Sequence, residues 1–308
     1  MKKQDESHSP HRSGTAAIVG RPNVGKSTFL NAALGEPLAI VSATPQTTRD
    51  RILGVARRPN VEIALLDTPG IHKPHSRLGR ALNRTAREAT EEADVVVYMT
   101  APPPPGARGL HEGDRTLLAD VGEGKPTVLV VNKVDRVRDK SVLLPLLEAL
   151  AKLRDFAAIV PISALRGDGT NLVLDEVAKT LPVAPPRFDE DTLTDRPTRF
   201  FAGEFVREQI LGWAREEIPH AVAVEVTRFE EQPKIIFIDA TIHVERDGQK
   251  RILIGKGGEK LKEVGTAARA RIEAMMEKKV HLGLFVRVTP GWTESDQALA
   301  ELGYGRTS

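Results

Sequence analysis

Five short apolar runs alternate with amphipathic stretches through the first half of the chain. The runs contain few polar side chains, which is typical of strands in a sheet that is covered on both faces. They are residues 16–20, 61–67, 94–100, 126–133 and 157–163. Helical periodicity fills the intervals, at about 77–92, 113–121, 141–153 and 170–180. This alternation predicts a doubly wound, mostly parallel α/β sheet.

The pattern changes after a segment rich in proline and acidic residues, LPVAPPRFDEDTLTDRP, at 181–197. Beyond it we expect a small α+β domain. Its predicted elements are a helix at about 200–217, alternating strands at about 221–230 and 234–245, a glycine-rich turn, a helix to about 277 and a strand at 281–289. The predicted organisation is a disordered tail (1–14), a nucleotide domain (15–182), a linker (183–199) and a second domain (200–308).

Composition excludes several classes of protein. The chain has no cysteine, so disulfides, thiolate metal sites and a cysteine nucleophile are excluded. No apolar run approaches the roughly 18 residues of a membrane span, and the first fourteen residues lack the apolar core of a signal peptide. The net charge is only +2, but residues 246–279 contain ten basic and five acidic side chains. A charged run of this kind usually forms a solvated face, and it indicates a binding function only where a motif accompanies it.

One motif between a predicted strand and a predicted helix points to phosphate binding. Gly20 and Gly25 stand five residues apart, and Lys26 and Ser27 follow directly. In this pattern backbone N–H groups surround phosphate oxygens, the lysine reaches the β- and γ-phosphates, and the serine hydroxyl binds Mg²⁺. The residues assigned to the nucleotide here are Gly20, Asn23, Val24, Gly25, Lys26, Ser27 and Thr28.

Three further segments follow strands of the same predicted sheet. Asp135 in NKVD presents a carboxylate that can accept both hydrogens of the guanine edge, which adenine lacks, so the site is predicted to select GTP over ATP. In DTPG, Asp67 is expected to hold Mg²⁺ through water, and the Gly70 N–H faces the γ-phosphate. Asn132 and Lys133 are expected at the base, and SAL supplies a backbone N–H to the guanine carbonyl from Ser163, Ala164 and Leu165.

The order GRPNVGKS, TTRD, DTPG, NKVD and SAL resembles the TrmE–Era branch of translational GTPases, over residues 15–180. The resemblance implies that SATPQTTRDR, residues 42–51, is the first switch. One of its threonines is implied to close onto Mg²⁺ and the γ-phosphate; Thr48 is favoured and Thr47 is the second choice.

The residue after DTPG is Ile71, where many small GTPases carry a glutamine that orients water. Isoleucine cannot do so, and slow unaided hydrolysis is expected. In relatives that share the asparagine of PNVGKS, that residue resembles a K⁺ ligand, which makes Asn23 a candidate. No general base is assigned, because positioning and charge neutralisation supply most of the barrier reduction. The candidate catalytic residues are Lys26, Thr48, Gly70 and Asn23.

A second glycine motif, Gly255–Gly258, precedes a basic amphipathic helix and follows the apolar run ILI. Small residues allow a nucleic-acid backbone to approach, and lysines beside them contact phosphates. The setting resembles a type II KH domain, with the helix first and the odd strand last. Trp213 is expected in the core, while Trp292 is assigned equally to packing and to RNA. The candidate RNA-binding residues are Arg251, Ile254, Gly255, Lys256, Gly257, Gly258 and Lys260.

Together the two halves resemble the Era-type ribosome-assembly GTPases over about nine-tenths of the chain. The resemblance implies GTP, GDP and Mg²⁺ as ligands, with K⁺ as an open addition. It implies binding of the 3′ end of small-subunit ribosomal RNA in the 30S pre-ribosome, no DNA, and a cytoplasmic location, with weak peripheral contact at the inner face of the membrane left open. Two alternatives remain: a nucleotide- and RNA-binding protein without significant turnover, and a GTPase whose second domain binds protein.

Overall fold

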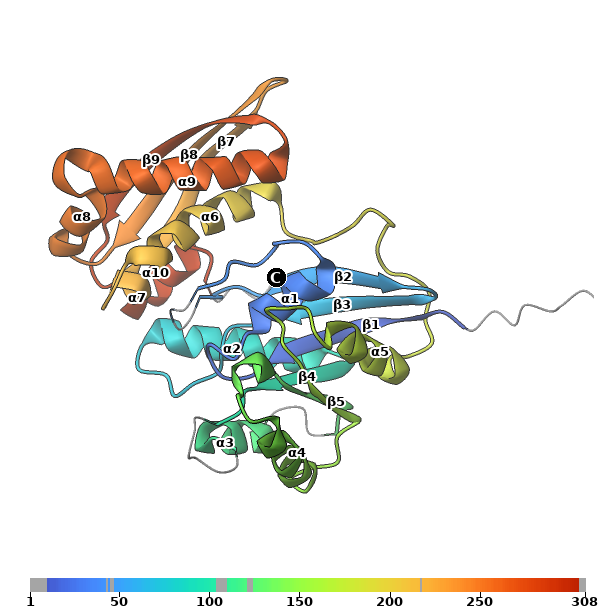
Figure 1. Cartoon of the computed structure of the whole chain (residues 1–308). Helices are drawn as coiled ribbons and strands as arrows, with labels where there is room; N and C mark the ends of the chain where they lie inside the picture. The colour runs from blue at the N-terminus through green and yellow to red at the C-terminus, as the bar shows by residue number, and fades with distance from the viewer. Residues whose placement is uncertain are drawn as a thin grey trace, which may run out of the picture. The chain divides into compact units, whose positions relative to one another are not determined.

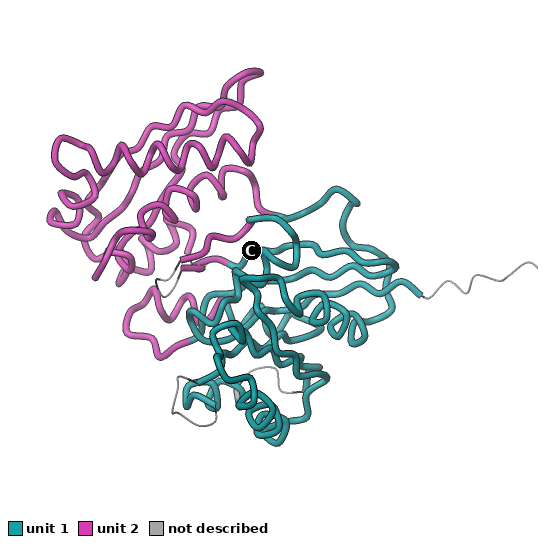
Figure 2. Tube along the Cα trace, in the orientation of Figure 1, with its two compact units in different colours: residues 1–37, 51–71, 86–195 teal, residues 38–50, 72–85, 196–308 magenta. Residues whose placement is uncertain are grey.

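The computed structural model describes residues 10–42, 44, 47–103, 110–120, 124–216 and 218–304. Figure 2 shows that the chain forms two compact units. Unit 1 contains Met1–Pro37, Arg51–Ile71 and Ala86–Asp195, and unit 2 contains Leu38–Asp50, His72–Thr85 and Arg196–Ser308. Two segments of the first half of the chain, 38–50 and 72–85, thus pack in unit 2 together with the second half.

Unit 1 is built on a six-stranded sheet in the order β2-β3-β1-β4-β5-β6. All neighbours pair in parallel except β2 and β3, which confirms the mostly parallel α/β prediction. The strands are β1 (Arg12–Val19), β2 (Ile52–Arg58), β3 (Val61–Asp67), β4 (Val95–Thr100), β5 (Thr127–Val131) and β6 (Ala158–Pro161). The helices are α1 (Lys26–Leu34), α3 (Glu112–Asp120), α4 (Leu143–Ala151) and α5 (Thr170–Thr180), with short turns η1 (Val134–Arg136) and η2 (Lys140–Val142).

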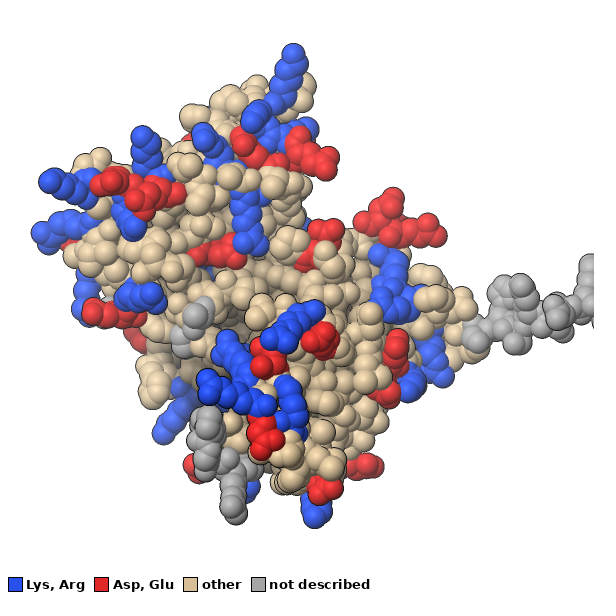
Figure 3. Space-filling model, in the orientation of Figure 1, with Lys and Arg blue, Asp and Glu red and all other residues tan. Residues whose placement is uncertain are grey.

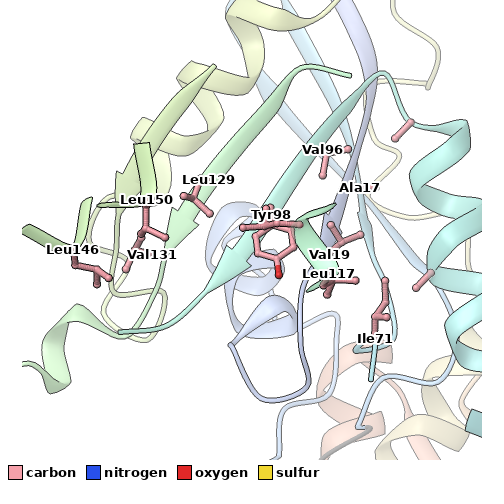
Figure 4. Close-up of a cluster of buried hydrophobic side chains, with 13 residues drawn as sticks. Ala17, Val19, Ile71, Val96, Tyr98, Leu117, Leu129, Val131, Leu146 and Leu150 are labelled. Carbon is pink, nitrogen blue, oxygen red and sulfur yellow. The ribbon is translucent and has the colours of Figure 1, made fainter. Parts of the chain in front are cut away.

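Helices cover both faces of this sheet (Figure 1). Helices α1 and α5 contact each other and the sheet on one face. On the other face α3, α4 and the C-terminal half of α2 (Arg77–Glu92) bury a continuous apolar cluster, shown in Figure 4. Each fully buried aliphatic side chain of such a cluster contributes about 1.5–3 kcal/mol to folding. The cluster residues include Val19, Val96, Tyr98, Leu117, Leu129, Val131, Leu146 and Leu150.

Unit 2 contains a three-stranded sheet in the order β7-β8-β9, where β7 and β8 are antiparallel and β8 and β9 are parallel. A parallel pair needs a crossover, which α8, η3 and α9 provide. Helices α6 and α9 pack over one face of this sheet (Figure 1). The elements are α6 (Thr198–Trp213), α7 (Ile218–Ala221), β7 (Ala223–Glu231), β8 (Ile235–Val244), α8 (Asp247–Ile254), η3 (Lys256–Gly258), α9 (Glu259–Met276), β9 (Lys279–Val288), η4 (Trp292–Glu294) and α10 (Asp296–Glu301).

The elements that the sequence pattern did not predict include β2, α8 and α10. Strand β1 begins at Arg12, inside the segment expected to be a tail, while residues 1–9 of that tail lie outside the described residues. Among the described residues, no helix combines the length and the apolar character that a membrane crossing requires.

Candidate nucleotide site and nucleic-acid interface

The loop between β1 and α1 needs glycine at two positions. Gly20 and Gly25 have φ values of 150° and 100°, in the region that favours glycine. A Cβ on Gly20 would lie 2.2 Å from the Met99 carbonyl oxygen, and one on Gly25 would lie 2.3 Å from the Asn132 amide nitrogen. The loop therefore packs directly on the ends of β4 and β5, and α1 starts at Lys26 with its N–H groups at the loop.

Lys26 is held inside this loop. It is 6% exposed, and its ammonium donates to the carbonyl oxygens of Gly20 (3.3 Å) and Arg21 (3.1 Å). Burial lowers the pKa of Lys26 to about 8, and the carboxylate of Asp67 opposes that shift. A buried ammonium with only neutral carbonyl acceptors and one nearby carboxylate is well suited to take up a phosphate anion.

The two residues expected to bind Mg²⁺ meet at the end of β3. The Ser27 hydroxyl donates to an Asp67 carboxylate oxygen at 2.6 Å, and both side chains are buried. Within the described residues no three His, Cys, Asp or Glu side chains gather into a metal cluster. One hydroxyl and one carboxylate fit Mg²⁺, which takes few protein ligands and completes its shell with phosphates and water.

Gly70 also lies tight against the phosphate loop. A Cβ at this position would come within 2.7 Å of the Pro22 backbone, and the N–H of Ile71 donates to the Gly20 carbonyl at 3.2 Å. The Ile71 side chain is 7% exposed and belongs to the core cluster of unit 1. A side chain packed in this way cannot orient a water molecule.

Asn132 joins the phosphate loop to the segments expected at the base. Its amide donates to the Val24 carbonyl (2.8 Å), and its side-chain oxygen accepts from the Ala164 N–H (2.9 Å). Lys133 adopts a φ of 66° and donates to the Asn23 carbonyl. The fold thus brings GRPNVGKS, NKVD and SAL together at one edge of the sheet, where open parallel sheets bind their ligands.

Asp135 is positioned by Ser163, whose hydroxyl donates to one carboxylate oxygen at 2.7 Å. This hydrogen bond lowers the pKa of Asp135, so the group is an ionised acceptor at neutral pH. Leu165, in the same segment, is 75% exposed. The arrangement leaves an anchored carboxylate that could accept from a group with two adjacent donors.

Nothing in the sequence pattern singles out Asp114, a carboxylate at 0% exposure behind the phosphate loop. It accepts from the hydroxyls of Tyr98 (3.1 Å) and Thr100 (3.0 Å) and pairs with Arg21 Nε at 2.9 Å. Because the carbonyl of Arg21 accepts from Lys26, the ion pair fixes the stretch of loop that faces the lysine.

Replacing Asp114 with Asn should therefore weaken GTP binding about tenfold, since it removes the charge that holds Arg21 but keeps the size of the side chain. Tyr98→Phe is the matched control, because it removes one hydrogen bond from the same carboxylate and leaves the ion pair intact. Titration with a fluorescent GTP analogue measures both. Equal losses in the two variants would assign the effect to general packing instead.

Of the segment expected to form the first switch, residues 42–50 belong to unit 2 and Arg51 belongs to unit 1. Thr48 is 8% exposed, and the hydroxyl of Thr47 donates to the Thr44 carbonyl at 2.7 Å. Ala43, Pro45 and Gln46 lie outside the described residues. Thr48 stays the prediction for Mg²⁺, with Thr47 as the second choice.

The glycine loop of unit 2 borders a hollow of about 470 Å³. Gly257 and Gly258 have φ values of 60° and 83°, and a Cβ on either would meet nothing within 4 Å, whereas one on Gly255 would lie 2.7 Å from Lys260 Cβ. Gly255 is thus required by packing, while Gly257 and Gly258 face open space. The hollow is lined by Gly258, Leu261, Lys262, Gly265, Thr266, Arg269, Leu282 and Leu284.

The other candidate RNA contacts surround this loop. Arg251 and Ile254 lie on α8, which ends at Gly255, and Lys256 is exposed in η3. Lys260 donates to Glu263 at 2.6 Å and lies 5.0 Å from the ring centroid of Trp213, so its ammonium is already engaged. Figure 3 shows basic side chains over α8 and α9 with acidic ones among them, so recognition here depends on local geometry.

The two tryptophans are both packing residues. Trp292 is fully buried, stacks on Tyr304 and donates to the Ala221 carbonyl at 3.0 Å, which decides the open question in favour of packing. Trp213 is partly buried and packs against the core cluster of unit 2, which confirms its packing role but not a position inside the core.

The chain matches two protein families. The family described as 50S ribosome-binding GTPase matches residues 15–133, and the KH domain family matches residues 217–293. The protein named GTPase Era of Stenotrophomonas maltophilia (strain K279a) is 46% identical over 298 residues, which cover 96% of this chain and 98% of that protein. GTPase Era of Xanthomonas axonopodis pv. citri (strain 306) is 46% identical over 299 residues with the same coverage.

Solved structures resemble the whole chain as well. A crystal structure of Era in complex with MgGDPNP and nucleotides 1506–1542 of 16S ribosomal RNA matches with a TM-score of 0.91 and 37% identity, covering 96% of this chain and 100% of that one. A variant of Aquifex aeolicus Era bound to GDP.AlF4- matches with the same TM-score, identity and coverage.

Proposed function

Because the chain belongs to the Era family of GTPases, we propose that it couples GTP hydrolysis to binding of the single-stranded 3′ end of small-subunit ribosomal RNA during 30S assembly. The observation that carries this proposal is Asn132, whose two hydrogen bonds tie the phosphate loop to the guanine segments, in a chain that also holds a KH-type glycine loop. We assign the nucleotide function to residues 15–182 and the RNA function to residues 200–308.

Mg²⁺ with GTP would be held by Ser27 and Asp67, with Thr48 closing onto it in the GTP state. The ion neutralises charge on the phosphates when it is bound. Lys26 would exchange its two carbonyl acceptors for β- and γ-phosphate oxygens, and the N–H of Gly70 would face the γ-phosphate. These groups would orient the phosphates and neutralise their charge, and these two effects account for most of the catalysis of phosphoryl transfer.

Hydrolysis is proposed to be slow and to depend on K⁺. The Ile71 side chain is part of the core, so the site has no glutamine-type group at that position. Asn23 has a φ of 62°, and its carbonyl accepts from Lys133, so the backbone of this residue is fixed beside the phosphate loop. We propose that its side chain is a ligand of K⁺, which supplies the positive charge that an arginine supplies in other GTPases.

Exchanging KCl for NaCl should lower the rate of GTP hydrolysis at least about fivefold, and Asn23→Gly should remove this difference. Glycine keeps the positive φ and deletes only the side chain. Asn60→Gly is the control, since Asn60 has a φ of 57° in the turn between β2 and β3. Phosphate release measured in both salts decides the matter; a rate that is equal in KCl and NaCl for the wild type argues against a K⁺ site.

The two alternative functions receive less support. A protein without turnover is not favoured, because the full-length relatives are named GTPases. A second domain for protein binding is not favoured, because residues 217–293 match the KH family. Contact with the 30S pre-ribosome follows from the proposed RNA, and any contact with the inner face of the membrane would be weak and peripheral.

A further inference from the structure

We infer that Arg49 is a positioning residue that fastens the segment carrying Thr48 to unit 2 and carries the effect of RNA binding to the nucleotide site. The inference rests on the proposed function, because it presumes that unit 2 binds RNA and that Thr48 serves the nucleotide. It adds the residue through which the two would communicate.

Arg49 is anchored by five partners within unit 2. Its side chain is buried, and its guanidinium donates to the carbonyl oxygens of Val222 (2.6 Å), Pro219 (2.9 Å) and His220 (3.1 Å). The guanidinium carbon lies 5.7 Å from the ring centroids of both Trp292 and Tyr304. The planar guanidinium group donates to three carbonyl oxygens and lies over two aromatic rings, and the ammonium group of a lysine cannot reproduce this geometry.

A second arginine holds the same segment from α6. The Arg207 side chain is fully buried and donates to the Thr47 carbonyl, while Glu204 balances its charge at 2.6 Å. The N–H of Val41 donates to Glu208 at 3.3 Å, also on α6. Thr48 therefore lies between two residues, Thr47 and Arg49, that are each fixed to unit 2.

The anchor contacts the parts of the chain that flank both edge strands of the sheet that carries the RNA groove, at one end of that sheet. The three carbonyls belong to α7 and the residue before β7, and Trp292 lies four residues after the end of β9. Leu282 and Leu284 of β9 line the hollow beside the glycine loop. A strand of RNA that shifts β9 would thus shift the aromatic rings on which Arg49 lies.

Chain connectivity links Arg49 to the nucleotide site. Ile52 begins β2 and pairs with Asp67, the residue that accepts from Ser27. Only Asp50 and Arg51 separate Arg49 from Ile52, so the two Cα atoms are at most about 10 Å apart. A movement of the anchor therefore displaces Thr48 and the start of β2 beside the proposed Mg²⁺ ligands.

The test compares Arg49→Lys with Arg57→Lys in the full chain. Arg57 is a control of the same type, since it donates to the carbonyls of Thr192 (2.9 Å) and Asp189 (2.6 Å) within unit 1. A fluorescein-labelled single-stranded RNA with the small-subunit 3′-end sequence is titrated with each protein bound to GDP or to a non-hydrolysable GTP analogue. The ratio of the two dissociation constants measures the coupling.

For the wild type and Arg57→Lys we expect this ratio to be about fivefold or more. For Arg49→Lys it should fall to within about 1.5-fold of unity, with little change in RNA affinity in the GDP state. Retention of the wild-type ratio in Arg49→Lys overturns the inference. A wild type that binds the RNA equally in both states overturns the coupling in the proposed function instead.

Hydrogen exchange on the free proteins tests the anchor without RNA. The peptide that contains residues 47–52 should exchange faster in Arg49→Lys than in the wild type or in Arg57→Lys, because the carbonyl contacts are lost. Unchanged exchange in Arg49→Lys shows that no anchor exists at this position and also overturns the inference.

Discussion

Replacing Asp135 with Asn is expected to lower the affinity for GTP about 100- to 1,000-fold and to raise the affinity for xanthosine triphosphate. In the proposed site the carboxylate would accept from two guanine donors, and each charge-assisted hydrogen bond contributes about 1.5–3 kcal/mol. Asparagine offers one acceptor and one donor. Because Ser163 donates to one oxygen of Asp135, the amide nitrogen of the variant should face the base, where it opposes the 2-amino group of guanine and matches the 2-oxo group of xanthine.

Asp139→Asn is the matched control for this experiment. Asp139 is an exposed carboxylate four residues further along, and it accepts from the Ser141 N–H at 2.9 Å. Competition of both triphosphates against a fluorescent GDP analogue gives the affinities. If Asp135→Asn weakens GTP and xanthosine triphosphate equally, the residue supports the loop without reading the base.

Replacing Gly257 with Asp is expected to weaken binding of single-stranded RNA at least about tenfold and to leave the fold intact. Gly257 has a φ of 60°, which Asp and Asn tolerate better than other residues, and a Cβ there meets nothing within 4 Å. The new carboxylate would stand beside the hollow, where a phosphate of the RNA is expected, and like charges repel.

Gly257→Asn separates charge from bulk, because it has the same size and the same backbone preference. We expect it to lose less than about threefold in RNA affinity. Thermal unfolding of both variants should match the wild type. Equal losses for Asp and Asn would mean that the RNA needs the absence of a side chain rather than the absence of a negative charge, and no loss for either would place the RNA elsewhere.

The nucleotide site could be predicted because its residues sit in short contiguous motifs at the ends of strands. GRPNVGKS and NKVD each carry their own backbone requirements, and a parallel sheet brings the ends of β1 and β5 to one edge. Local sequence patterns could not predict the hydrogen bonds that join these motifs to one another. The hydrogen bonds of Asn132 to Val24 and Ala164 span 108 and 32 residues.

The missed elements have local reasons. β2 contains Gly54, which lowers strand propensity, yet the fold needs it because a Cβ there would lie 2.5 Å from Leu34. β2 is also the antiparallel edge strand of a parallel sheet, so it does not follow the strand–helix alternation. α8 begins with Asp247 and Gly248 and has only eight residues, which is too short for a clear helical period.

The roles of Arg49 and Asp114 could not be predicted from the sequence for a different reason. In the sequence each is one charged residue among many, and its role comes from partners far along the chain. Arg49 contacts the 219–222 turn, Trp292 and Tyr304, while Asp114 contacts Arg21, Tyr98 and Thr100. Burying a charged group among hydrogen-bond partners requires tertiary structure, and no periodic pattern in the sequence indicates it.

We propose that one chain joins a GTP-hydrolysing site to an RNA site. Multiple-turnover GTP hydrolysis in KCl, with and without the single-stranded RNA of the small-subunit 3′ end, tests this for the wild type and Gly257→Asp. We expect the RNA to change the wild-type rate and to leave the rate of the variant unchanged. A wild-type enzyme that binds the RNA but hydrolyses GTP at the same rate in its presence would mean that the two sites act independently.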